Sequence, residues 1–207
     1  MSGPGTLGVL LAGGQGRRLG LGVPKALAKL GGRTFLERAL EALRGACDDV
    51  VVALPPSIDL PLKGIARIDD VAPDAGPLAG MIAGLGSRPF QCAMVLGVDY
   101  PLMRASVLQA LMAMFEEERT HNPNLDALVP VIGGRVQPLA GVYAPSALPV
   151  LRGEFDRGTR AVVAAVGRLM LLRCDEPRLI AALGDAAALT MFAHVNTPED
   201  LGMAESR

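Results

Sequence analysis

The feature that most constrains the fold is a nearly continuous apolar run, Leu7 to Ala12, that turns directly into a loop of glycines and cations. The run is too short for a typical helix and shows no alternation of apolar and polar residues. Such a pattern is typical of a strand buried on both faces, as in parallel sheets covered by helices on each side. The run therefore predicts a strand inside an α/β sheet.

Strands and helices alternate along the rest of the chain. The expected strands are Asp49–Leu54, Ile65–Ile68, Cys92–Gly97, Asp126–Ile132 and Arg168–Arg173. Helix starts are expected at Thr34–Glu37 and Ser106–Gln109 (capping boxes), at Pro77, near Pro145–Arg152 and Arg160–Val166, and at Thr197–Asp200. Gly133-Gly134 is a tight-turn signal, with a partner strand from Val136. We expect one α/β domain, residues 1–207, with a doubly wound, mostly parallel sheet and a local antiparallel hairpin.

Composition excludes several classes of function. The net charge of −1 gives no overall basic field for nucleic acid or for an anionic membrane. No apolar run is long enough to span a membrane, and the first residues lack the pattern of a signal peptide. Three cysteines without CxxC spacing favour a reduced, cytoplasmic protein in which Cys92 and Cys174 are core residues. Two distant histidines exclude a His/Cys zinc site, whereas a hard cation held by carboxylates and substrate phosphates stays open.

The loop after the first strand favours phosphate binding. Gly13 and Gly14 allow backbone amides to approach an anion, and Arg18 and Lys25 add charge suited to a polyphosphate. The dinucleotide fingerprint starting at Gly14 fails because position 19 is leucine. The P-loop fails because Lys25 is followed by alanine. A surface loop with solvated cations is the alternative.

Two carboxylates follow expected strands. Asp99 lies at the carboxyl end of the run CAMVLG, where it can hold Mg²⁺ against substrate phosphates. Asp70 follows the strand that ends at Ile68 and should point to the same edge, with nucleotide contact as its expected role. The neighbouring Asp69 is the alternative residue for this nucleotide contact, and Asp74 is interpreted as a turn residue. A capping or turn role is the alternative for Asp70 and Asp99.

Five segments follow one another along the chain: LAGGQGRRLGLGVPKAL, Asp70 with GPLAGM, VLGVDYPLM, GGRVQPLAGVY and FAHVNTPEDL. In this order they resemble the motifs of the molybdenum cofactor guanylyltransferases (the MobA type), which belong to the nucleotidyltransferases with a glycosyltransferase-A-like fold. The resemblance implies a Rossmann-like fold of the nucleotide-diphospho-sugar transferase type. It also implies transfer of GMP from GTP to the phosphate of the molybdenum-pterin cofactor, with Mg²⁺ and release of pyrophosphate, and transient contact with cofactor-delivery or acceptor enzymes.

The resemblance also assigns roles to residues. Catalytic roles fall on Arg18, Lys25 and Asp99, with Asp99 as the metal ligand. Nucleotide contacts fall on Leu11, Ala12, Gly13, Gly14, Lys25, Asp70, Gly76, Pro77, Leu78 and Asp99. Acceptor contacts are expected from Arg135, Gln137, Arg160 and Asn196. For Arg160, at the expected start of a helix, an acceptor phosphate would offset the unfavourable helix dipole.

The chain departs from the family pattern at several positions. Lys25 lies seven residues after Arg18 and follows proline, an ending more similar to cytidylyltransferases and sugar nucleotidyltransferases. Ala53 replaces a common asparagine, Gln137 a histidine, and His194 an asparagine. A transferase that uses CTP or another nucleotide, with a phosphorylated sugar, polyol or pterin as acceptor, therefore stays open. A nucleotide-binding protein without turnover is a further alternative.

Overall fold

The computed structural model describes residues 4–20, 22–72 and 75–206, so Asp74 lies outside the described residues. The strands of the main sheet are β1 (Leu7–Leu11), β4 (Asp49–Leu54), β5 (Ala66–Asp69), β6 (Ala93–Gly97), β7 (Ala127–Ile132), β8 (Arg135–Val136), β9 (Ala140–Tyr143) and β10 (Leu171–Cys174). The helices are α1 (Phe35–Arg44), α2 (Pro77–Leu85), α3 (Ala105–His121), α4 (Ala147–Asp156), α5 (Val162–Val166), α6 (Glu176–Leu183) and α7 (Pro198–Glu205).

Short elements complete the fold. A small hairpin consists of β2 (Lys29–Leu30) and β3 (Arg33–Thr34), and the 3₁₀ turns are η1 (Arg17–Leu19), η2 (Lys25–Leu27) and η3 (Ala186–Phe192). Among the helices that the structure describes, none is long and apolar enough to cross a membrane.

The sheet is mixed but mostly parallel, with the strand order β10-β7-β9-β6-β1-β4-β5. Strand β1 pairs in parallel with β4 on one side and with β6 on the other. The strand order reverses at β1, because the chain adds β4 and β5 on one side of β1 and then continues with β6 on the other side. Strand β9 runs antiparallel to both β6 and β7. The expected doubly wound sheet is confirmed, as is the hairpin, in which β8 pairs antiparallel with β7.

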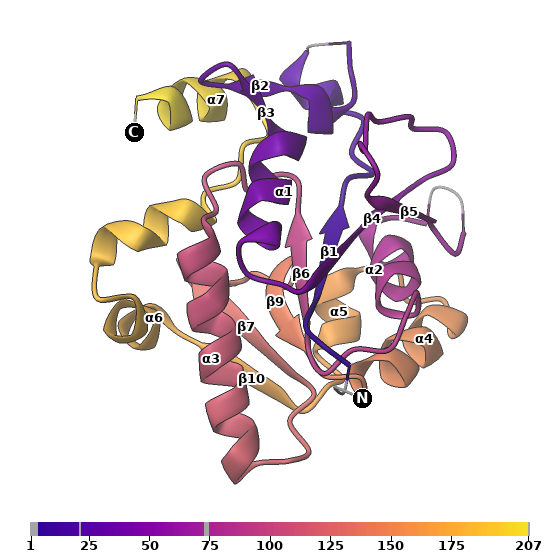
Figure 1. The fold of residues 1–207 in the computed structure, drawn as a ribbon, viewed down its shortest axis with the longest axis vertical. Helices are drawn as coiled ribbons and strands as arrows, with labels where there is room; N and C mark the ends of the chain where they lie inside the picture. The colour runs from indigo at the N-terminus through magenta and orange to yellow at the C-terminus, as the bar shows by residue number, and fades with distance from the viewer. Residues whose placement is uncertain (1–3, 21, 73–74, 207) are drawn as a thin grey trace.

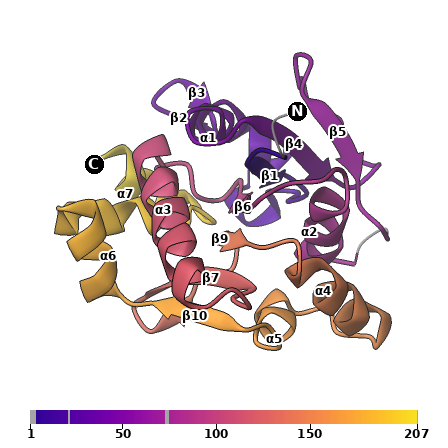
Figure 2. The same cartoon turned by 60° about the horizontal axis from the view of Figure 1, so that its bottom comes forward.

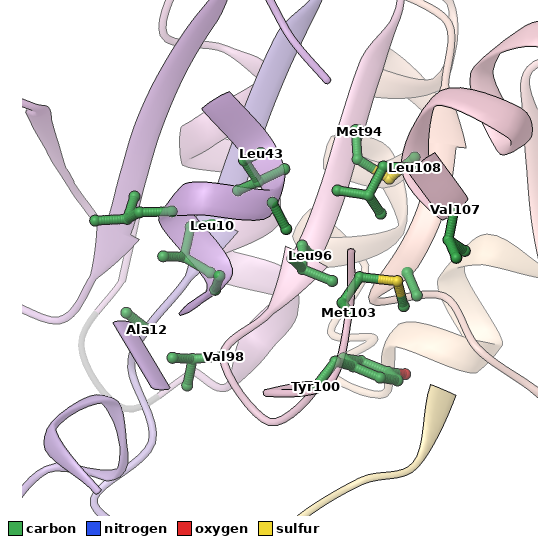
Figure 3. Close-up of a cluster of buried hydrophobic side chains, with 14 of the residues drawn as sticks. Leu10, Ala12, Leu43, Met94, Leu96, Val98, Tyr100, Met103, Val107 and Leu108 are labelled. Atoms are coloured by element: carbon green, nitrogen blue, oxygen red, sulfur yellow. The ribbon is translucent and has the colours of Figure 1, made fainter. Parts of the chain in front are cut away.

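Helices cover both faces of the sheet, and the strands alternate their side chains between them. On one face, Leu10 of β1 and Met94 and Leu96 of β6 pack in one cluster with residues of α1 and α3, including Leu43 and Leu108 (Figure 3). On the other face, alternate strand residues pack in a second cluster with α2, α4 and α5. Figures 1 and 2 show the two helical layers on opposite sides of the sheet. Burial on both faces explains why the first strand is a nearly continuous apolar run.

Two helices begin where the sequence predicts, and the structure has a capping box at the start of each. In α1 the Thr34 hydroxyl accepts from the backbone amide of Glu37, and the Glu37 carboxylate accepts from the amide of Thr34. In α7 Thr197 and Asp200 make the same reciprocal pair. The capping box at Ser106 was predicted incorrectly, because α3 already begins at Ala105, with no side-chain cap in the structure.

Two further boundaries differ from expectation. Helix α5 begins at Val162 after an extended Ala161, so Arg160 precedes the helix and does not open it. Strand β10 begins at Leu171, because the chain turns before it. Cys92 and Cys174 are buried and unpaired, as expected for core cysteines.

Candidate functional site

A cleft of about 450 Å³ lies at the carboxyl ends of β1, β4 and β6, where the strand order reverses. Its floor includes Leu11, which pairs in register with Ala53 on one side and with Gly97 on the other. Small residues on both sides of Leu11 leave room above the sheet. The loop after β1 and the start of α2 form the walls. In open α/β sheets such a switch point is the usual place for a ligand.

The glycine-rich loop after β1 is closed by one backbone hydrogen bond. The amide of Lys25 donates to the carbonyl of Gly14 over 2.9 Å. Gly16 has a φ of 63°, and a Cβ at this position would lie 2.8 Å from the carbonyl oxygen of Val23. Only glycine therefore fits at Gly16 without shifting the loop. The closure brings Lys25 and Arg18 to the cleft, together with Gly13 and Gly14.

The three predicted catalytic residues, Arg18, Lys25 and Asp99, all line this cleft. Lys25 is only 8% exposed, and burial lowers the pKa of its amine, although the charge of Asp99 acts in the opposite direction. The amine donates to Asn196 Oδ1 at 2.6 Å and lies 3.9 Å from Asp99 Oδ2.

Asp99 keeps its charge despite its position. Burial alone would raise the pKa of this carboxyl, but the hydrogen bond from His194 and the charge of Lys25 outweigh burial and hold the pKa below its ordinary value. Its Oδ1 lies over the α-carbon of Gly97, where a Cβ would clash with it. Glycine at position 97 therefore gives Asp99 its place at the cleft.

Asp70 occupies the other end of the cleft, beside α2. Its Oδ1 is buried without a hydrogen-bond partner within the described part of the chain, and a Cβ on Gly80 would lie 2.9 Å from it. Burial raises the pKa of Asp70 to about 6, the charge of Asp69 adds to the shift, and Arg67 opposes it. Arg67 is directed elsewhere, since it donates to Asp69 Oδ1. Asp70 lines the cleft, and a carboxylate with an oxygen left without a partner has the chemistry of an acceptor for ligand N–H groups.

Most of the predicted nucleotide contacts lie together. Leu11, Gly13, Gly14, Lys25, Asp70, Gly76, Pro77 and Asp99 all line the cleft. Ala12 and Leu78 do not line it, since both are completely buried. The amide of Ala12 already donates to the carbonyl of Ala53. Gly80, at the end of the small-residue segment that the sequence indicated, also lines the cleft, and four residues without an assigned role join it: Gln15, Pro55, Val98 and Leu139.

The predicted acceptor contacts are separated in the structure. Asn196 reaches Lys25, and Gln137 is buried beside the site, whereas Arg135 is exposed on β8. Arg160 stacks over the ring of Phe155 and donates to the carbonyl of that residue at 2.7 Å. Arg160 is not among the residues that line the cleft.

Sequence reasoning missed the role of His194. Its Nδ1 lies 3.0 Å from Asp99 Oδ2, and its Nε2 lies 2.8 Å from Gln137 Oε1, which also accepts from the Tyr100 hydroxyl. The available signal was the position of His194 two residues before Asn196, since alternate residues of an extended segment face the same side.

Asp99 is the candidate metal ligand. Within the described ranges, no three His, Cys, Asp or Glu side chains gather in an arrangement that could hold a metal ion. Mg²⁺ is usually held by one or two carboxylates together with substrate phosphates, so a lone carboxylate beside a loop that carries Arg18 and Lys25 fits such an ion.

Comparison with known proteins gives a consistent family. Residues 8–170 match the family model of the MobA-like NTP transferase domain. The molybdenum cofactor guanylyltransferase of Desulfosudis oleivorans is 30% identical over 199 residues, covering 96% of this chain and 94% of that protein. A probable enzyme of the same name from Methanosarcina mazei is 33% identical over 204 residues, covering 93% and 87%.

Solved structures similar to this chain are consistent with the same family. The molybdopterin-guanine dinucleotide biosynthesis protein A of Archaeoglobus fulgidus superposes with a TM-score of 0.77 at 26% identity and covers 97% of each chain. A 2-C-methyl-D-erythritol 4-phosphate cytidylyltransferase from Thermus thermophilus superposes with a TM-score of 0.66 over 96% of each chain, at 22% identity, and this likeness extends to the fold alone. The chain is therefore a nucleotidyltransferase and belongs to the MobA-like NTP transferase family.

Proposed function

We propose that this protein transfers GMP from GTP to the phosphate of the molybdenum-pterin cofactor and releases pyrophosphate. The relatives named as molybdenum cofactor guanylyltransferases over almost their full length support this reaction. The matched lengths also support one nucleotidyltransferase domain over residues 1–207.

The observation that carries the choice of base is the buried oxygen of Asp70 that has no partner among the described residues. Guanine offers two adjacent N–H donors on its pairing edge, N1–H and the N2 amino group. Adenine, cytosine and uracil each present one donor beside acceptors on that edge. A carboxylate can accept both donors of guanine, and a site with an acceptor-only group discriminates strongly against bases that leave it unpaired. Asp70 therefore favours GTP.

The transfer step needs positioning and charge neutralisation more than proton transfer. An oxygen of the acceptor phosphate attacks the α-phosphorus of GTP. The bond from the α-phosphorus to the oxygen that bridges to the β-phosphate breaks, and its electron pair leaves with pyrophosphate. Lys25 and Arg18 bind the triphosphate and stabilise the negative charge that moves to the leaving group. The acceptor phosphate is already ionised near neutral pH and requires no general base.

In this proposal Asp99 holds a Mg²⁺ ion. When bound, the ion neutralises charge on the phosphates. The contribution of the chain is the placement of Asp99, whose ionised state His194 and Lys25 favour. Asn196 and Gln137 are the acceptor contacts closest to this centre, and both contact other groups of the site.

The function is tested by calorimetric titration of the protein with GTP, CTP, ATP and UTP in the presence of Mg²⁺. We expect GTP to bind at least tenfold more tightly than the other three nucleotides. Pyrophosphate release should require GTP and the phosphorylated pterin together. Selective binding of CTP would contradict the choice of base, and tight GTP binding without any pyrophosphate release would identify a binding protein without turnover.

A further inference from the structure

An extended segment, residues 193–196, lies along the loop after β6. The amide of Val195 donates to the carbonyl of Asp99 at 3.0 Å, and the Val195 side chain is buried at 1% exposure. Because side chains alternate along extended backbone, His194 and Asn196 lie on the opposite side from Val195. Each of them reaches one of the two charged groups of the site: His194 reaches Asp99, and Asn196 reaches Lys25.

These two contacts keep an anion and a cation from pairing directly. A hydrogen-bonded pair of ammonium and carboxylate has a separation of about 2.7–2.9 Å. The amine of Lys25 and Oδ2 of Asp99 are 3.9 Å apart, while Lys25 makes a hydrogen bond of 2.6 Å to Asn196 and Asp99 makes one of 3.0 Å to His194. In a buried site the attraction between opposite charges is strong. Without competing partners the two groups would close to direct contact, and that pair would have to break before either could bind a phosphate or a cation.

The orientation of His194 is itself fixed. The Gln137 side-chain nitrogen donates to the carbonyl of Arg135 at 3.2 Å, so its oxygen is the atom that faces His194 and Tyr100. Gln137 Oε1 can only accept, so Nε2 is the donor in that contact, and the ring plane is held so that Nδ1 points at Asp99. Because the Asp99 carboxylate also only accepts, both ring nitrogens donate together in the imidazolium form of His194. The ring also packs against Tyr100, with 4.3 Å between the centroids.

From this geometry we propose that His194 is a positioning residue, which holds the carboxylate of Asp99 apart from Lys25 and thereby keeps it available to a divalent cation. The proposal rests on the function proposed above. It assigns no contact between His194 and the substrates. The residue acts through Asp99, and its loss should weaken metal binding with little change in nucleotide binding in the absence of metal.

The test uses the full chain with His194→Phe, which keeps a ring and removes both hydrogen bonds. His194→Gln returns a donor, and His121→Phe applies the same change to an exposed histidine on α3. Binding of Mn²⁺ is measured by the electron paramagnetic resonance signal of free Mn²⁺, with a GTP analogue that carries a methylene bridge between the α- and β-phosphates. Affinity for the analogue is measured separately by calorimetry in EDTA.

We expect His194→Phe to weaken Mn²⁺ binding at least tenfold and to change the metal-free affinity for the analogue less than threefold. His194→Gln should recover most of the loss, and His121→Phe should match the parent. A crystal structure of His194→Phe should show the Lys25 amine in direct hydrogen-bonding contact with Asp99.

Three outcomes would overturn the proposal. The first is Mn²⁺ affinity in His194→Phe equal to or tighter than that of the parent. The second is a lower melting temperature without any change in metal affinity, which identifies a purely structural residue. The third is a rise only in the KM for the acceptor, which identifies a direct substrate contact. A parent protein that binds no Mn²⁺ with the analogue would refute both the proposed function and this inference. If the parent does bind Mn²⁺, the result for His194→Phe tests the role of His194 alone.

Discussion

Replacing Asp70 with asparagine should stabilise the protein and weaken its substrate binding at the same time. Burial raises the pKa of this carboxyl from 3.8 to about 6, so the folded state holds the proton more tightly than the unfolded chain does. The free energy of unfolding therefore falls as the pH rises from about 4 to about 6, and the loss remains above that window. The asparagine side chain of the variant has no charge to desolvate and avoids this loss.

The magnitude follows from the rise in pKa. A rise of about two pH units corresponds to about 3 kcal/mol. Since the residue as a whole is only partly buried, we discount this to about 1.5 kcal/mol for solvent screening. For a chain of this size, that difference raises the melting temperature by roughly 3–6 °C. The gap between Asp70→Asn and the parent should be close to zero at about pH 4 and reach its full value above about pH 7.

Thermal unfolding of both proteins across this pH range, without nucleotide, measures the stability difference. Calorimetry with GTP at pH 7.5 measures function, and we expect a loss of tenfold or more because a carboxylate that accepts two donors contributes about 1–3 kcal/mol of discrimination. Asp69→Asn is the matched control, because it removes the same charge from the neighbouring residue, which is already paired with Arg67. It should bring much less stabilisation than Asp70→Asn, because burial and not the charge of Asp69 is the main cause of the raised pKa of Asp70, and it should bring no loss of GTP affinity.

Two results would refute the reasoning about Asp70. A melting temperature of Asp70→Asn that stays at or below that of the parent at every pH would show that the carboxylate carries no desolvation cost. Unchanged GTP affinity would show that its unpartnered oxygen does not face the base.

Three further changes test the site and the fold. Lys25→Met should lower kcat at least 100-fold and leave the melting temperature within a few degrees, because a buried cation is lost together with its desolvation cost; near-normal turnover in a steady-state assay would exclude Lys25 from catalysis. Gly84→Ala should lower the free energy of unfolding by about 1–3 kcal/mol in urea titrations, since a Cβ there would clash with Val9 of β1; an unchanged midpoint would contradict this packing. Thr34→Ala should cost about 1 kcal/mol by loss of the cap to Glu37, again measured in urea, and a change below a few tenths would show that the cap is dispensable.

The elements that the sequence predicted well are those whose signals are local. The run from Asp49 to Leu54 contains three consecutive valines and is buried after its first residue, and the structure has a strand with the same bounds. Thr34 and Thr197 cap their helices through residues three positions away. Gly133-Gly134 makes a turn between two short strands, both glycines with positive φ. In each case the residues that decide the structure are neighbours in the chain.

The position of the antiparallel strand β9 in the sheet could not be predicted from the sequence. Its residues, Ala140–Tyr143, are four buried apolar positions, which suit either direction of pairing. Their position between β6 and β7 depends on how the whole chain winds, not on the segment itself. Helix α6 was missed although Asp175 caps it and Pro177 lies in its first turn, the same kind of start signal as in α7. The turn η3 was missed because its small residues leave little periodicity.

In the candidate site, too, features with local signals could be predicted and contacts between distant residues could not. The loop from Gly13 to Lys25 and the carboxylate of Asp99 follow strands directly, so their meeting at one sheet edge could be predicted. The contact of His194 with Asp99 joins residues 95 positions apart, and no local pattern encodes it. For Arg160 the sequence predicted a ligand contact that the structure does not place at the cleft. Its guanidinium stacks instead on the ring of Phe155.

The backbone hydrogen bond from Val195 to Asp99 has a consequence for the order in which the protein loses structure and activity. The segment that carries His194 and Asn196 is joined to partners 95 and 171 residues away, and such distant contacts form late in folding. Regions held by few hydrogen bonds open locally at a lower free energy than the central strands. In mild denaturant, catalysis should therefore be lost while the circular dichroism of the sheet is still native.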